Sequence, residues 1–451
     1  MWSSADTTIE LHWTSAEQPV FVDRSAGNIA AQRFVADIER AQRWLAPAQQ
    51  RQVVLFDQSR YRFAVWFIAA LKQGMSLCLP GSAQPDWLAQ VSDVDALQLV
   101  DQALPPVSNK PSVAAANHEL TLTLSSNACF SLFTSGSSGA PKRIDKSLAQ
   151  LQCEAEHLSD TFAQQLQQRR VLSTVTHQHI YGLLWSLWLP LWRQQLIVSQ
   201  TLIDMEDWLS ALSAPSVLVS SPTHLSRFEE LTRVLQNGNQ GAIFSSGGLL
   251  AADTAISYQQ QLHAAPWEIY GSTETGGIGY RQNHDGEQSW LALPRVSLSQ
   301  DARGCLAIRS MHLANQQVFQ TDDRVELIND RCFRLLGRVD RIVKVAEKRV
   351  SLTALEQFLQ QHPWVSRCAA CLLAQHGGRL ALVVELTTNG QQAAAQMNKH
   401  QLNQTFRQYL LQRFERVVLP RYFRYPARLP ENATGKVTQA QLQSLFQEHS
   451  A

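Results

Sequence analysis

The chain has 451 residues, of which 45% are hydrophobic and 17% are charged, and its 39 basic and 38 acidic residues give a formal net charge of +1. This ordinary apolar fraction excludes a largely disordered chain. The balanced charge argues against a general nucleic-acid binder, which needs a surplus of positive charge to neutralise phosphates. The length predicts two or three domains, each with room for a hydrophobic core.

Targeting signals are not apparent, and the sequence predicts a cytoplasmic protein without an integral membrane segment. Residues 1–6 lack a basic segment followed by an apolar run, so we expect no export signal. The longest apolar stretch, residues 181–192, contains Pro190 and is too short to span a bilayer. Seven scattered cysteines, an odd number, do not form a disulfide framework. Cys368 and Cys371 have redox or zinc spacing, but their apolar surroundings favour a core strand.

The first 300 or so residues alternate helical and strand-like patterns. Apolar residues recur at i, i+3 and i+4 in residues 30–45, which predicts an amphipathic helix, and residues 61–72 predict a second helix that ends at Gly74. Short apolar runs predict strands at residues 53–56, 76–79, 170–176, 195–199, 216–220 and 242–246. Alternation of this kind indicates an α/β fold with mixed, mostly parallel sheets flanked by helices.

After about Trp290 short strands and turns replace this alternation. Strands are predicted at residues 304–309, 324–328 and 332–336, the last two as a hairpin in a small β-rich subdomain. We therefore expect a large N-terminal domain over residues 1–339 and a small α+β domain over residues 340–451. In the small domain the patterns predict a helix over residues 352–362, strands over residues 367–374 and 380–385, and a solvated helix over residues 393–404.

One loop has the composition of a phosphate site. Residues 131–142 (SLFTSGSSGAPK) place an apolar strand before hydroxyls and glycines, and Lys142 closes the loop. Glycines let backbone N–H groups approach a polyanion, hydroxyls add donors and the lysine adds positive charge. The loop is not a Walker A loop, because no Gly-Lys-Ser/Thr follows the spacer. The alternative is a flexible surface turn.

A second motif combines a carboxylate with hydroxyls. Residues 267–277 (WEIYGSTETGG) predict a strand that leads into a turn with Glu274 between two threonines. Glu274 is a candidate Mg²⁺ ligand and Thr273 a candidate phosphate contact, while the glycines admit a flat ligand. The alternative is an ordinary capped helix start.

Two further groups lie closer to the C-terminus. Asp323 and Arg338 belong to segments that read TDD and GRVDRIVK. A carboxylate can accept from both hydroxyls of a ribose, and an arginine nearby can bond the same sugar or a phosphate. Residues 429–436 (LPENATGK) present Lys436 on a turn. Taken alone, these would be a surface hairpin and a solvated lysine.

Together, the order and spacing of these motifs over residues 25–445 resemble the adenylate-forming superfamily of acyl-CoA synthetases, nonribosomal-peptide adenylation domains and luciferases. The superfamily pattern reads Thr-Ser-Gly-Ser/Thr-Thr-Gly-x-Pro-Lys, Tyr-Gly-x-Thr-Glu, Thr-Gly-Asp, Gly-Arg-x-Asp-x-x-Lys and Gly-Lys. In that superfamily a carboxylate and ATP give an acyl-adenylate and pyrophosphate, and a thiol then takes the acyl group. The resemblance therefore implies ATP and Mg²⁺ as cofactors.

The resemblance also implies roles for individual residues. It places Gly271 and Ser272 at the nucleotide, Thr273 at the α-phosphate and Glu274 on Mg²⁺. Asp323 matches the ribose-binding carboxylate and Arg338 its companion. Lys436 matches the lysine that reaches both the substrate carboxylate and the α-phosphate, where charge compensation matters more than a base. The loop over the β- and γ-phosphates corresponds to Thr134, Ser135, Gly136, Ser137, Ser138, Gly139 and Lys142.

The acid substrate would occupy a neighbouring pocket. His179 matches a histidine or aromatic gate beside the acyl pocket and thiol tunnel, and the alternative is a packed core histidine. Aromatic and small residues mingle at the expected walls, which favours a flat or modestly sized apolar acid. The wall residues implied by the resemblance are Tyr181, Ser246, Gly247, Gly248 and Gly276.

The resemblance further implies a rotation of the small domain between the two half-reactions. Asp340 falls at the hinge of the superfamily, and hinges are a few residues that absorb large backbone changes. Rotation would withdraw Lys436 and present residues 344–350 instead, so that Lys344 and Glu347 would lie in the thioester loop.

Three positions depart from the superfamily pattern, because Arg143, Asp322 and Glu347 stand where it has glycine. The glycine at the last position lies against the pantetheine arm in the superfamily, so Glu347 bears on thioester formation and not on adenylation. The part ahead of the hinge is short and resembles compact stand-alone ligases that prime bacterial carrier proteins, including those of aryl-polyene and fatty-acid-like pathways.

A run of arginines bears on the thiol acceptor. Within 22 residues that contain one acid, Glu415, lie the residues of an arginine strip, namely Arg407, Arg413, Arg416, Arg421, Arg424 and Arg428. Such a strip suits an acidic acyl carrier protein or the phosphates of CoA. The alternative is a solvated face whose stems cover apolar surface.

The sequence therefore predicts an ATP- and Mg²⁺-dependent acid–thiol ligase that acts on an aromatic or medium-size acyl carboxylic acid. The favoured acceptor is the phosphopantetheine thiol of an acyl carrier protein, and the alternative is free CoA. A less favoured alternative is a non-catalytic nucleotide-binding regulatory module.

Overall fold

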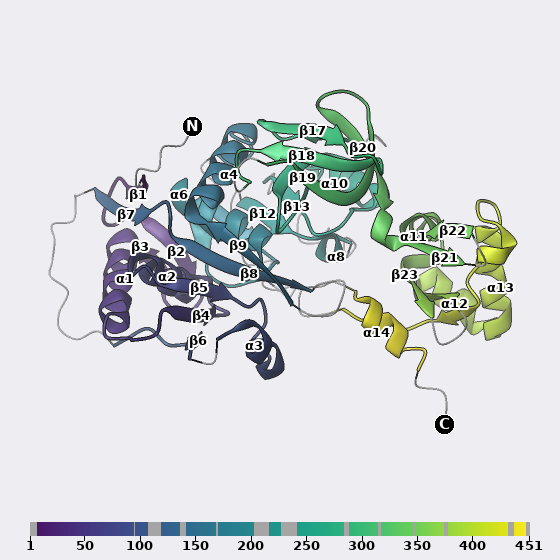
Figure 1. Ribbon diagram of the computed structural model, residues 1–451, viewed down its shortest axis with the longest axis horizontal. Helices are drawn as coiled ribbons and strands as arrows, with labels where there is room; N and C mark the ends of the chain where they lie inside the picture. The colour runs from purple at the N-terminus through teal and green to yellow at the C-terminus, as the bar shows by residue number, and fades with distance from the viewer. Residues whose placement is uncertain are drawn as a thin grey trace. The chain divides into compact units, whose positions relative to one another are not determined.

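The chain folds into two compact units, shown in a computed structural model (Figure 1). The first unit comprises residues 1–297 and 308–319, and the second comprises residues 298–307 and 320–451. The structure describes residues 7–93, 95–106, 119–135, 141–167, 170–202, 216–226, 241–283, 288–313, 317–345, 348–373, 378–431 and 437–447. The mixed α/β architecture confirms the predicted fold class. A hinge at Asp340 stays a prediction.

Two larger sheets organise the first unit. One has the order β6-β4-β5-β8-β9, parallel except for its last strand, and its strands are β4 (Gln52–Phe56), β5 (Ser76–Leu79), β6 (Leu97–Val100), β8 (Cys129–Ser135) and β9 (Pro141–Ser147). The other runs in the order β16-β15-β14-β13-β12-β10-β11-β2-β3. Its strands are β2 (Pro19–Asp23), β3 (Gly27–Ala30), β10 (Arg170–Ser173), β11 (Ile197–Val198), β12 (Ser216–Ser220), β13 (Ile243–Ser245), β14 (Trp267–Ser272), β15 (Gly276–Arg281) and β16 (Ser289–Ala292). A separate antiparallel pair consists of β1 (Thr8–Trp13) and β7 (Leu120–Ser125).

Helices pack against these sheets as the apolar spacing predicts. In α1 (Ala31–Leu45) the buried positions include Phe34, Ile38 and Leu45. The helix α2 (Arg60–Lys72) ends before Gly74, whose φ of +67° suits the predicted glycine stop. The remaining helical elements of this unit are α3 (Pro85–Val91), α4 (Leu148–Thr161), α5 (Ile180–Leu183), the π-helical turn η1 (Leu184–Trp188), α6 (Leu189–Trp192), α8 (Pro222–Leu225) and α10 (Ala252–Leu262). Of the helices in the described ranges, none combines the length and the apolar character that crossing a bilayer requires.

Short strands follow Trp290, as predicted, and the predicted domain limits of residues 1–339 and 340–451 stay a prediction. The strands β17 (Val296–Gln300), β18 (Cys305–Ser310), β19 (Phe319–Leu327) and β20 (Cys332–Arg338) are neighbours in that order. The last two form the predicted antiparallel hairpin, although β19 begins five residues earlier than the apolar run at residues 324–328 suggests. The early part of β19 is polar, so its sequence alone carries no strand signal.

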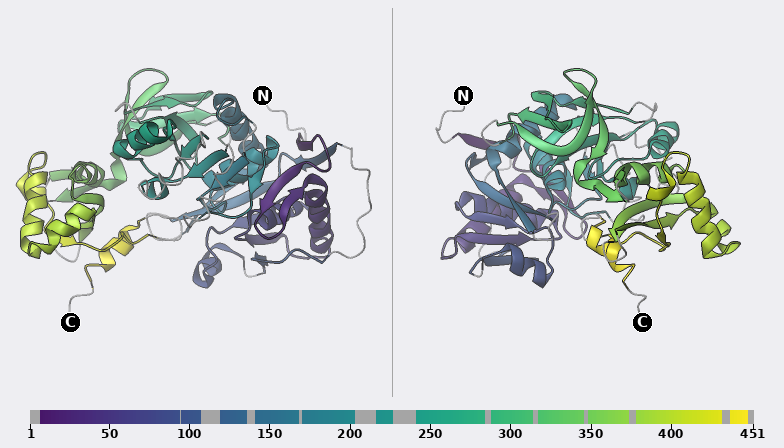
Figure 2. Two further views of the ribbon diagram at one scale, coloured as in Figure 1. Left: turned by 180° about the vertical axis from the view of Figure 1, so that it is seen from behind. Right: turned by 45° about the vertical axis from the view of Figure 1, so that its right-hand side comes forward.

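The C-terminal part of the second unit is a small α+β fold. Its elements are η3 (Val339–Arg341), β21 (Ile342–Val345), β22 (Lys348–Ser351), α11 (Leu352–Gln360), β23 (Val365–Leu373), β24 (Arg379–Leu386), α12 (Thr388–Ala395), α13 (Lys399–Leu410), η5 (Arg416–Val418), β25 (Tyr422–Arg424) and α14 (Gln439–Ser444). Alternate residues of β24 face opposite sides: Leu382 packs with α11 and α13, and Val383 packs with α14. Figure 2 shows this C-terminal part of the chain in green to yellow. Cys371 lies buried with a free thiol on the α14 side, which confirms the predicted core strand.

The predicted single helix over residues 393–404 is wrong. The chain forms α12 and α13 there, with residues 396–398 between them. Asn398 and Gln401 make a capping box that starts a new helix. Because Leu402 and Phe406 are buried in the core, α13 is also less solvated than its glutamines suggest.

The buried histidine His157 lies in the interior of the first unit and is uncharged at neutral pH. His157 on α4 is buried, and Nη1 of Arg295 donates to its Nε2 at 3.2 Å. Burial, with the nearby His312 and the Arg295 guanidinium, lowers the pKa of His157 to about 4. The imidazole is therefore uncharged in the folded chain at pH values where it is protonated in the unfolded chain, near its usual pKa of about 6.5.

This difference predicts a pH-dependent stability. The unfolded chain binds the His157 proton as pH falls through about 6.5, whereas the folded chain does so only near pH 4, so acidification favours unfolding in this window. We expect the free energy of unfolding of the wild type to fall more steeply on acidification than that of His157→Gln. Urea unfolding between about pH 7.5 and 5 measures the two slopes. The exposed control His400→Gln should match the wild type, and parallel profiles for wild type and His157→Gln would contradict the assignment.

Candidate active site

The motif around Glu274 forms a tight turn between two antiparallel strands. It joins β14 to β15, and we call residues 271–277 the Thr-Glu turn. Ser272 N donates to Thr275 Oγ1 at 3.0 Å, and Thr275 N donates to Ser272 Oγ at 3.2 Å. These bonds leave Thr273 and Glu274, both half-buried, at the tip. The alternative of a capped helix start is therefore wrong.

Two glycines make this turn sterically possible. A Cβ on Gly271 would lie 2.2 Å from the carbonyl oxygen of Gly276, so a side chain there would collide with the opposite strand. Gly276 has φ +67°, in the left-handed region where glycine is favoured. The sequence Tyr-Gly-Ser-Thr-Glu-Thr-Gly-Gly thus suits this sharp reversal of the chain.

The phosphate-loop motif lies beside the Thr-Glu turn. Thr134 in β8 pairs with Lys142 in β9, and Ser135 ends β8. Nζ of Lys142 bonds Oε1 of Glu274 at 2.8 Å. Burial acts to raise the pKa of Glu274, but the hydrogen bond from Lys142 and further donors outweigh it and lower that pKa. At neutral pH the site therefore presents an ionised carboxylate and an ammonium in contact.

These residues fit a magnesium ion that arrives with a nucleotide. Glu274 supplies an ionised carboxylate at the tip of the turn, and carboxylate oxygens suit Mg²⁺. Among the residues with described positions, no three His, Cys, Asp or Glu side chains form a cage that could hold a metal ion. Mg²⁺ usually takes one or two carboxylates and completes its shell with phosphates and water. The donor set therefore suits Mg²⁺ shared with phosphate oxygens.

Three buried side chains that the sequence analysis missed contact the backbone of the Thr-Glu turn. They are Lys146 on β9, Glu154 on α4 and His312 after β18. One signal was available, because Glu154 interrupts an otherwise apolar stripe that includes Leu151 and Leu158. The other two could not be found from local patterns, since their contacts come from distant segments.

The expected acyl-pocket turn, Ser246-Gly247-Gly248, follows β13 and is fastened to β14. Ser246 Oγ donates to the carbonyl of Ile269 at 2.8 Å, and Gly247 adopts φ +92°. Two residues later, Leu250 N donates to Oε2 of Glu268 at 2.8 Å. The turn is thus attached to the strand that leads into the Thr-Glu turn.

Glu268 is itself neutralised by a buried ion pair that the sequence analysis did not identify. Nε of Arg281 lies 2.9 Å from its Oε1, and the two side chains are 9% and 1% exposed, respectively. Glu268 and Arg281 are directly paired across β14 and β15, and the guanidinium also covers the ring of Trp290. Breaking such a pair would leave a buried charge without a partner.

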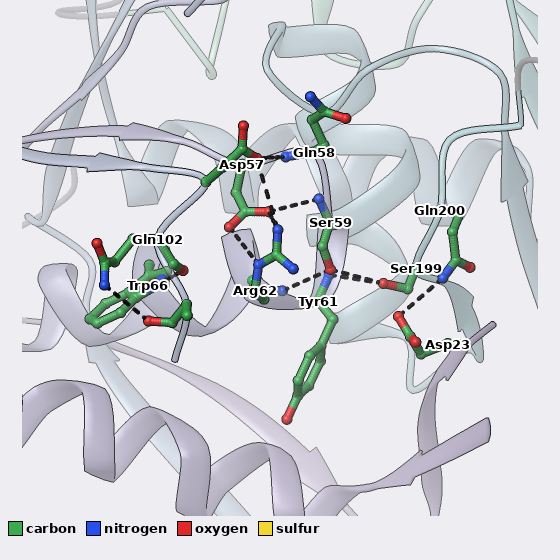
Figure 3. A network of polar contacts seen from close by, with 12 residues as sticks. Asp23, Asp57, Gln58, Ser59, Tyr61, Arg62, Trp66, Gln102, Ser199 and Gln200 are labelled. Carbon is green, nitrogen blue, oxygen red and sulfur yellow. Dashed lines mark hydrogen bonds and ion pairs between the residues drawn. The ribbon is translucent and has the colours of Figure 1, made fainter. Parts of the chain in front are cut away.

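The segment that carries His179 rests on the N-terminal end of α2. His177 Nε2 and Gln178 Nε2 bond the carbonyl oxygen of Asp57 at 2.9 and 2.7 Å. The Asp57 carboxylate is fixed in turn by Arg62 through bonds of 2.7 and 2.8 Å (Figure 3). His177 is buried, and its structural role stays a prediction.

His179 itself precedes α5 and lies against another turn. A Cβ on Gly81 would be 3.1 Å from Cε1 of His179, so the imidazole packs on the turn that follows β5. Tyr181, on the first turn of α5, contacts Trp185 with ring centroids 6.2 Å apart. The structure therefore places an imidazole and an aromatic wall on one anchored segment, and the gate role stays a prediction.

The predicted ribose-binding residues form a cluster in the second unit. Asp323 and Arg338 are paired across β19 and β20, with Arg338 Nη1 3.6 Å from Asp323 Oδ1. Asp322, where the superfamily pattern has glycine, lies 3.0 Å from Nη1 of Arg303 and 4.0 Å from Nη2 of Arg338. The added carboxylate is thus balanced by its own arginine, and Asp323 keeps Arg338 close.

Several predicted residues receive no structural account. Asp340 lies in η3 and Lys344 in β21, and only their backbone is described. Outside the described residues lie Gly136, Ser137, Ser138, Gly139, Glu347 and Lys436. Their roles stay predictions.

Comparisons with known proteins match the part of the chain that contains two of these motifs. The sequence model of the AMP-binding enzyme family matches residues 82–298, which include the phosphate loop and the Thr-Glu turn. A 4-coumarate–CoA ligase of Cereibacter sphaeroides is 28% identical over 322 residues, 71% of this chain and 72% of the relative.

Solved structures show the same fold. A benzoate CoA ligase from Burkholderia xenovorans LB400 superposes with a TM-score of 0.74 at 17% identity, over 95% of this chain and 97% of that one. The ATP-bound RpMatB-BxBclM chimera B1 gives 0.76 at 17% identity over 97% of both chains. With the ordered motifs, the family match identifies residues 82–298 as similar to AMP-binding enzymes, and the solved structures show that nearly the whole chain has their fold.

Proposed function

We propose that this enzyme activates an aromatic or medium-size acyl carboxylic acid with ATP and transfers the acyl group to a phosphopantetheine thiol. In the first step a carboxylate oxygen bonds the α-phosphorus and pyrophosphate leaves. In the second, the thiol sulfur bonds the acyl carbon, the thiol proton goes to solvent and AMP leaves. The observation that carries the proposal is the Lys142–Glu274 contact at 2.8 Å beside Thr273.

The contact between Lys142 and Glu274 suits a site that opens for a polyanion. The Lys142 side chain is 57% exposed, and ion pairs this close to solvent contribute only about 0–1 kcal/mol. Phosphate oxygens can therefore take Lys142 from Glu274 at little cost. Glu274 would then hold Mg²⁺, which supplies positive charge against the phosphates. Thr273 would donate its hydroxyl proton to an α-phosphate oxygen.

The remaining roles follow from the resemblance. Asp323 would accept hydrogen bonds from the ribose hydroxyls while Arg338 holds its carboxylate in place. Lys436 would compensate the charge that builds at the α-phosphorus. A carboxylate substrate is already ionised at neutral pH, so these residues supply positive charge and orientation and no base is needed.

A substitution at Glu274 tests the first step. We expect the wild type to release pyrophosphate from ATP with at least one acid of a panel of aryl and alkyl carboxylates. Glu274→Gln should lower that rate by about 10²–10³-fold, because it removes a preorganised electrostatic contact. Coupled pyrophosphate detection with hydroxylamine as acceptor measures the rate. Glu10→Gln, an exposed exchange on β1, is the matched control and should match the wild type.

Two results would contradict adenylation. ATP binding in calorimetry without pyrophosphate release for any acid would favour a non-catalytic nucleotide-binding module. An unchanged rate in Glu274→Gln would refute the role of that carboxylate.

Two arginines of the strip bond the backbone of their own chain, and the other four are exposed. Arg407 donates to the carbonyls of Pro420 and Arg421 at 2.8 and 2.7 Å, and Arg424 donates to the carbonyl of Leu445 at 3.0 Å. These two arginines therefore serve the fold. The exposed members of the strip are Arg413, Arg416, Arg421 and Arg428.

An acyl carrier protein suits these exposed arginines. Carrier proteins are acidic, and complementary charge accelerates association with such a partner. The one acid of the strip, Glu415, is 3.1 Å from Nζ of Lys348, which reduces its effect on the positive surface. Free CoA is the second candidate acceptor, since a relative such as the one from Cereibacter sphaeroides is named a CoA ligase.

Charge reversal on the strip separates the two acceptors. We expect Arg416→Glu to lower kcat/KM for a purified holo acyl carrier protein by about tenfold at low salt, because it weakens electrostatic attraction. Turnover with free CoA should change little. Lys399→Glu, an exposed reversal at the start of α13, should leave both rates unchanged. Wild-type turnover with CoA that equals or exceeds turnover with the carrier protein, and no effect of Arg416→Glu, would instead support the CoA ligase.

A further inference from the structure

We propose that Lys146, Glu154 and His312 form a buried clamp that positions Thr273 and Glu274 for adenylation. All three belong to the first unit, and they come from β9, α4 and the segment after β18. They bind the backbone of the Thr-Glu turn and are positioning residues, not groups that touch the substrate. The inference rests on the proposed function in so far as it concerns catalysis.

Lys146 holds the turn at Glu274. Its side chain is 6% exposed, and Nζ donates to the carbonyl oxygen of Glu274 at 2.9 Å. Lys142 lies four residues earlier on the same strand, and therefore on the same face, and its Nζ bonds the carboxylate of the same glutamate. Two lysines of β9 thus bind Glu274. The exposed Lys142 contacts its carboxylate, and the buried Lys146 contacts its backbone carbonyl.

Glu154 and His312 hold the other end of the turn, at Gly277. Oε1 of Glu154, which is 7% exposed, accepts from Gly277 N at 2.6 Å. His312 Nε2 bonds the carbonyl oxygen of Gly277 at 3.1 Å. A Cβ on Gly276 would lie 2.4 Å from Oε2 of Glu154, so the carboxylate packs directly on the turn. Both polar backbone groups of Gly277 are therefore bound by buried side chains.

Burial of charged side chains costs free energy, so we expect these residues to serve the geometry of the site. Burial lowers the pKa of Lys146, while the negative charges of Glu154 and Glu274 act in the opposite direction. Well-packed apolar residues often stabilise a core as well as or better than buried charges do. Here the charged side chains of Lys146 and Glu154 bind the backbone at Glu274, at the tip of the turn, and at Gly277, where the turn ends. Hydrogen-bonded supporting residues of this kind fix the geometry of an active site.

The clamp also borders the segment with the expected gate. Ile180, the residue after His179, lines the same small enclosed pocket as the three clamp residues. The pocket is lined by Lys146, Gln150, Leu151, Glu154, Ile180 and His312. The clamp residues therefore contact the Thr-Glu turn and also border the segment that carries His179.

Two substitutions each remove a clamp contact, and a third, conservative substitution keeps one. Lys146→Met removes the donor to Glu274, and Glu154→Ala removes the acceptor for Gly277. We expect each to lower kcat of ATP–pyrophosphate exchange by about tenfold to a hundredfold, because small misplacements of reacting groups cost about that much. KM for ATP should change by about twofold at most. Glu154→Gln keeps an oxygen for Gly277 N and should recover most of kcat. Lys72→Met, an exposed lysine on α2, is the control and should match the wild type.

Amide hydrogen exchange gives a readout that does not depend on activity. We expect a peptide that spans residues 270–278 to exchange faster in Lys146→Met and in Glu154→Ala, while β4 and β5 keep wild-type protection. Wild-type kcat in the two folded variants, or unchanged exchange in this peptide, would overturn the clamp. If Glu154→Ala does not fold, Lys146→Met alone decides. A wild type that releases no pyrophosphate with any acid would refute the proposed function, and exchange alone would then decide whether the clamp holds the turn.

Discussion

The position of Glu274 depends on hydrogen bonds from buried side chains to the backbone of the Thr-Glu turn. A two-strand turn leaves the residues at its tip without ladder partners, so their position depends on contacts from elsewhere. Here the bond between Ser272 and Thr275 closes the turn, and buried side chains bind the carbonyl of Glu274 and both polar groups of Gly277. The glycines are required by the same packing, since the opposite strand and a carboxylate occupy the space of a Cβ. The side chains of Thr273 and Glu274 remain available for chemistry because backbone groups bear these contacts.

This arrangement suits a reaction between two anions. A carboxylate that approaches a triphosphate needs positive charge and fixed geometry, and the site offers both. Lys142 and Glu274 neutralise each other in the absence of ligand, and their partial exposure keeps that contact weak enough to exchange. The acyl-side turn and the residues after it are attached to β14 through the bonds from Ser246 to Ile269 and from Leu250 to Glu268. One strand therefore links the expected acid pocket to the residues expected at the α-phosphate.

Much of this could be predicted from local sequence patterns. The helix at residues 30–45 and the hairpin at β19 and β20 follow from apolar spacing and turn residues. The helix break at Asn398 was missed because a capping box outweighed the run of helix-forming residues. Lys146 and His312 could not be recognised, since their contacts are made with a segment more than 30 residues away in the chain. Glu154 offered a signal as a carboxylate in an apolar stripe, which indicates a buried partner.

The central claim is that an oxygen of the organic acid attacks the α-phosphorus of ATP. An acid labelled with oxygen-18 in its carboxylate tests this directly, by mass spectrometry of the nucleotide product after complete transfer to a thiol. The account predicts AMP that carries a labelled oxygen, because the acyl carbon–oxygen bond breaks when the thiol attacks. Unlabelled AMP, or ADP as the product, would contradict it.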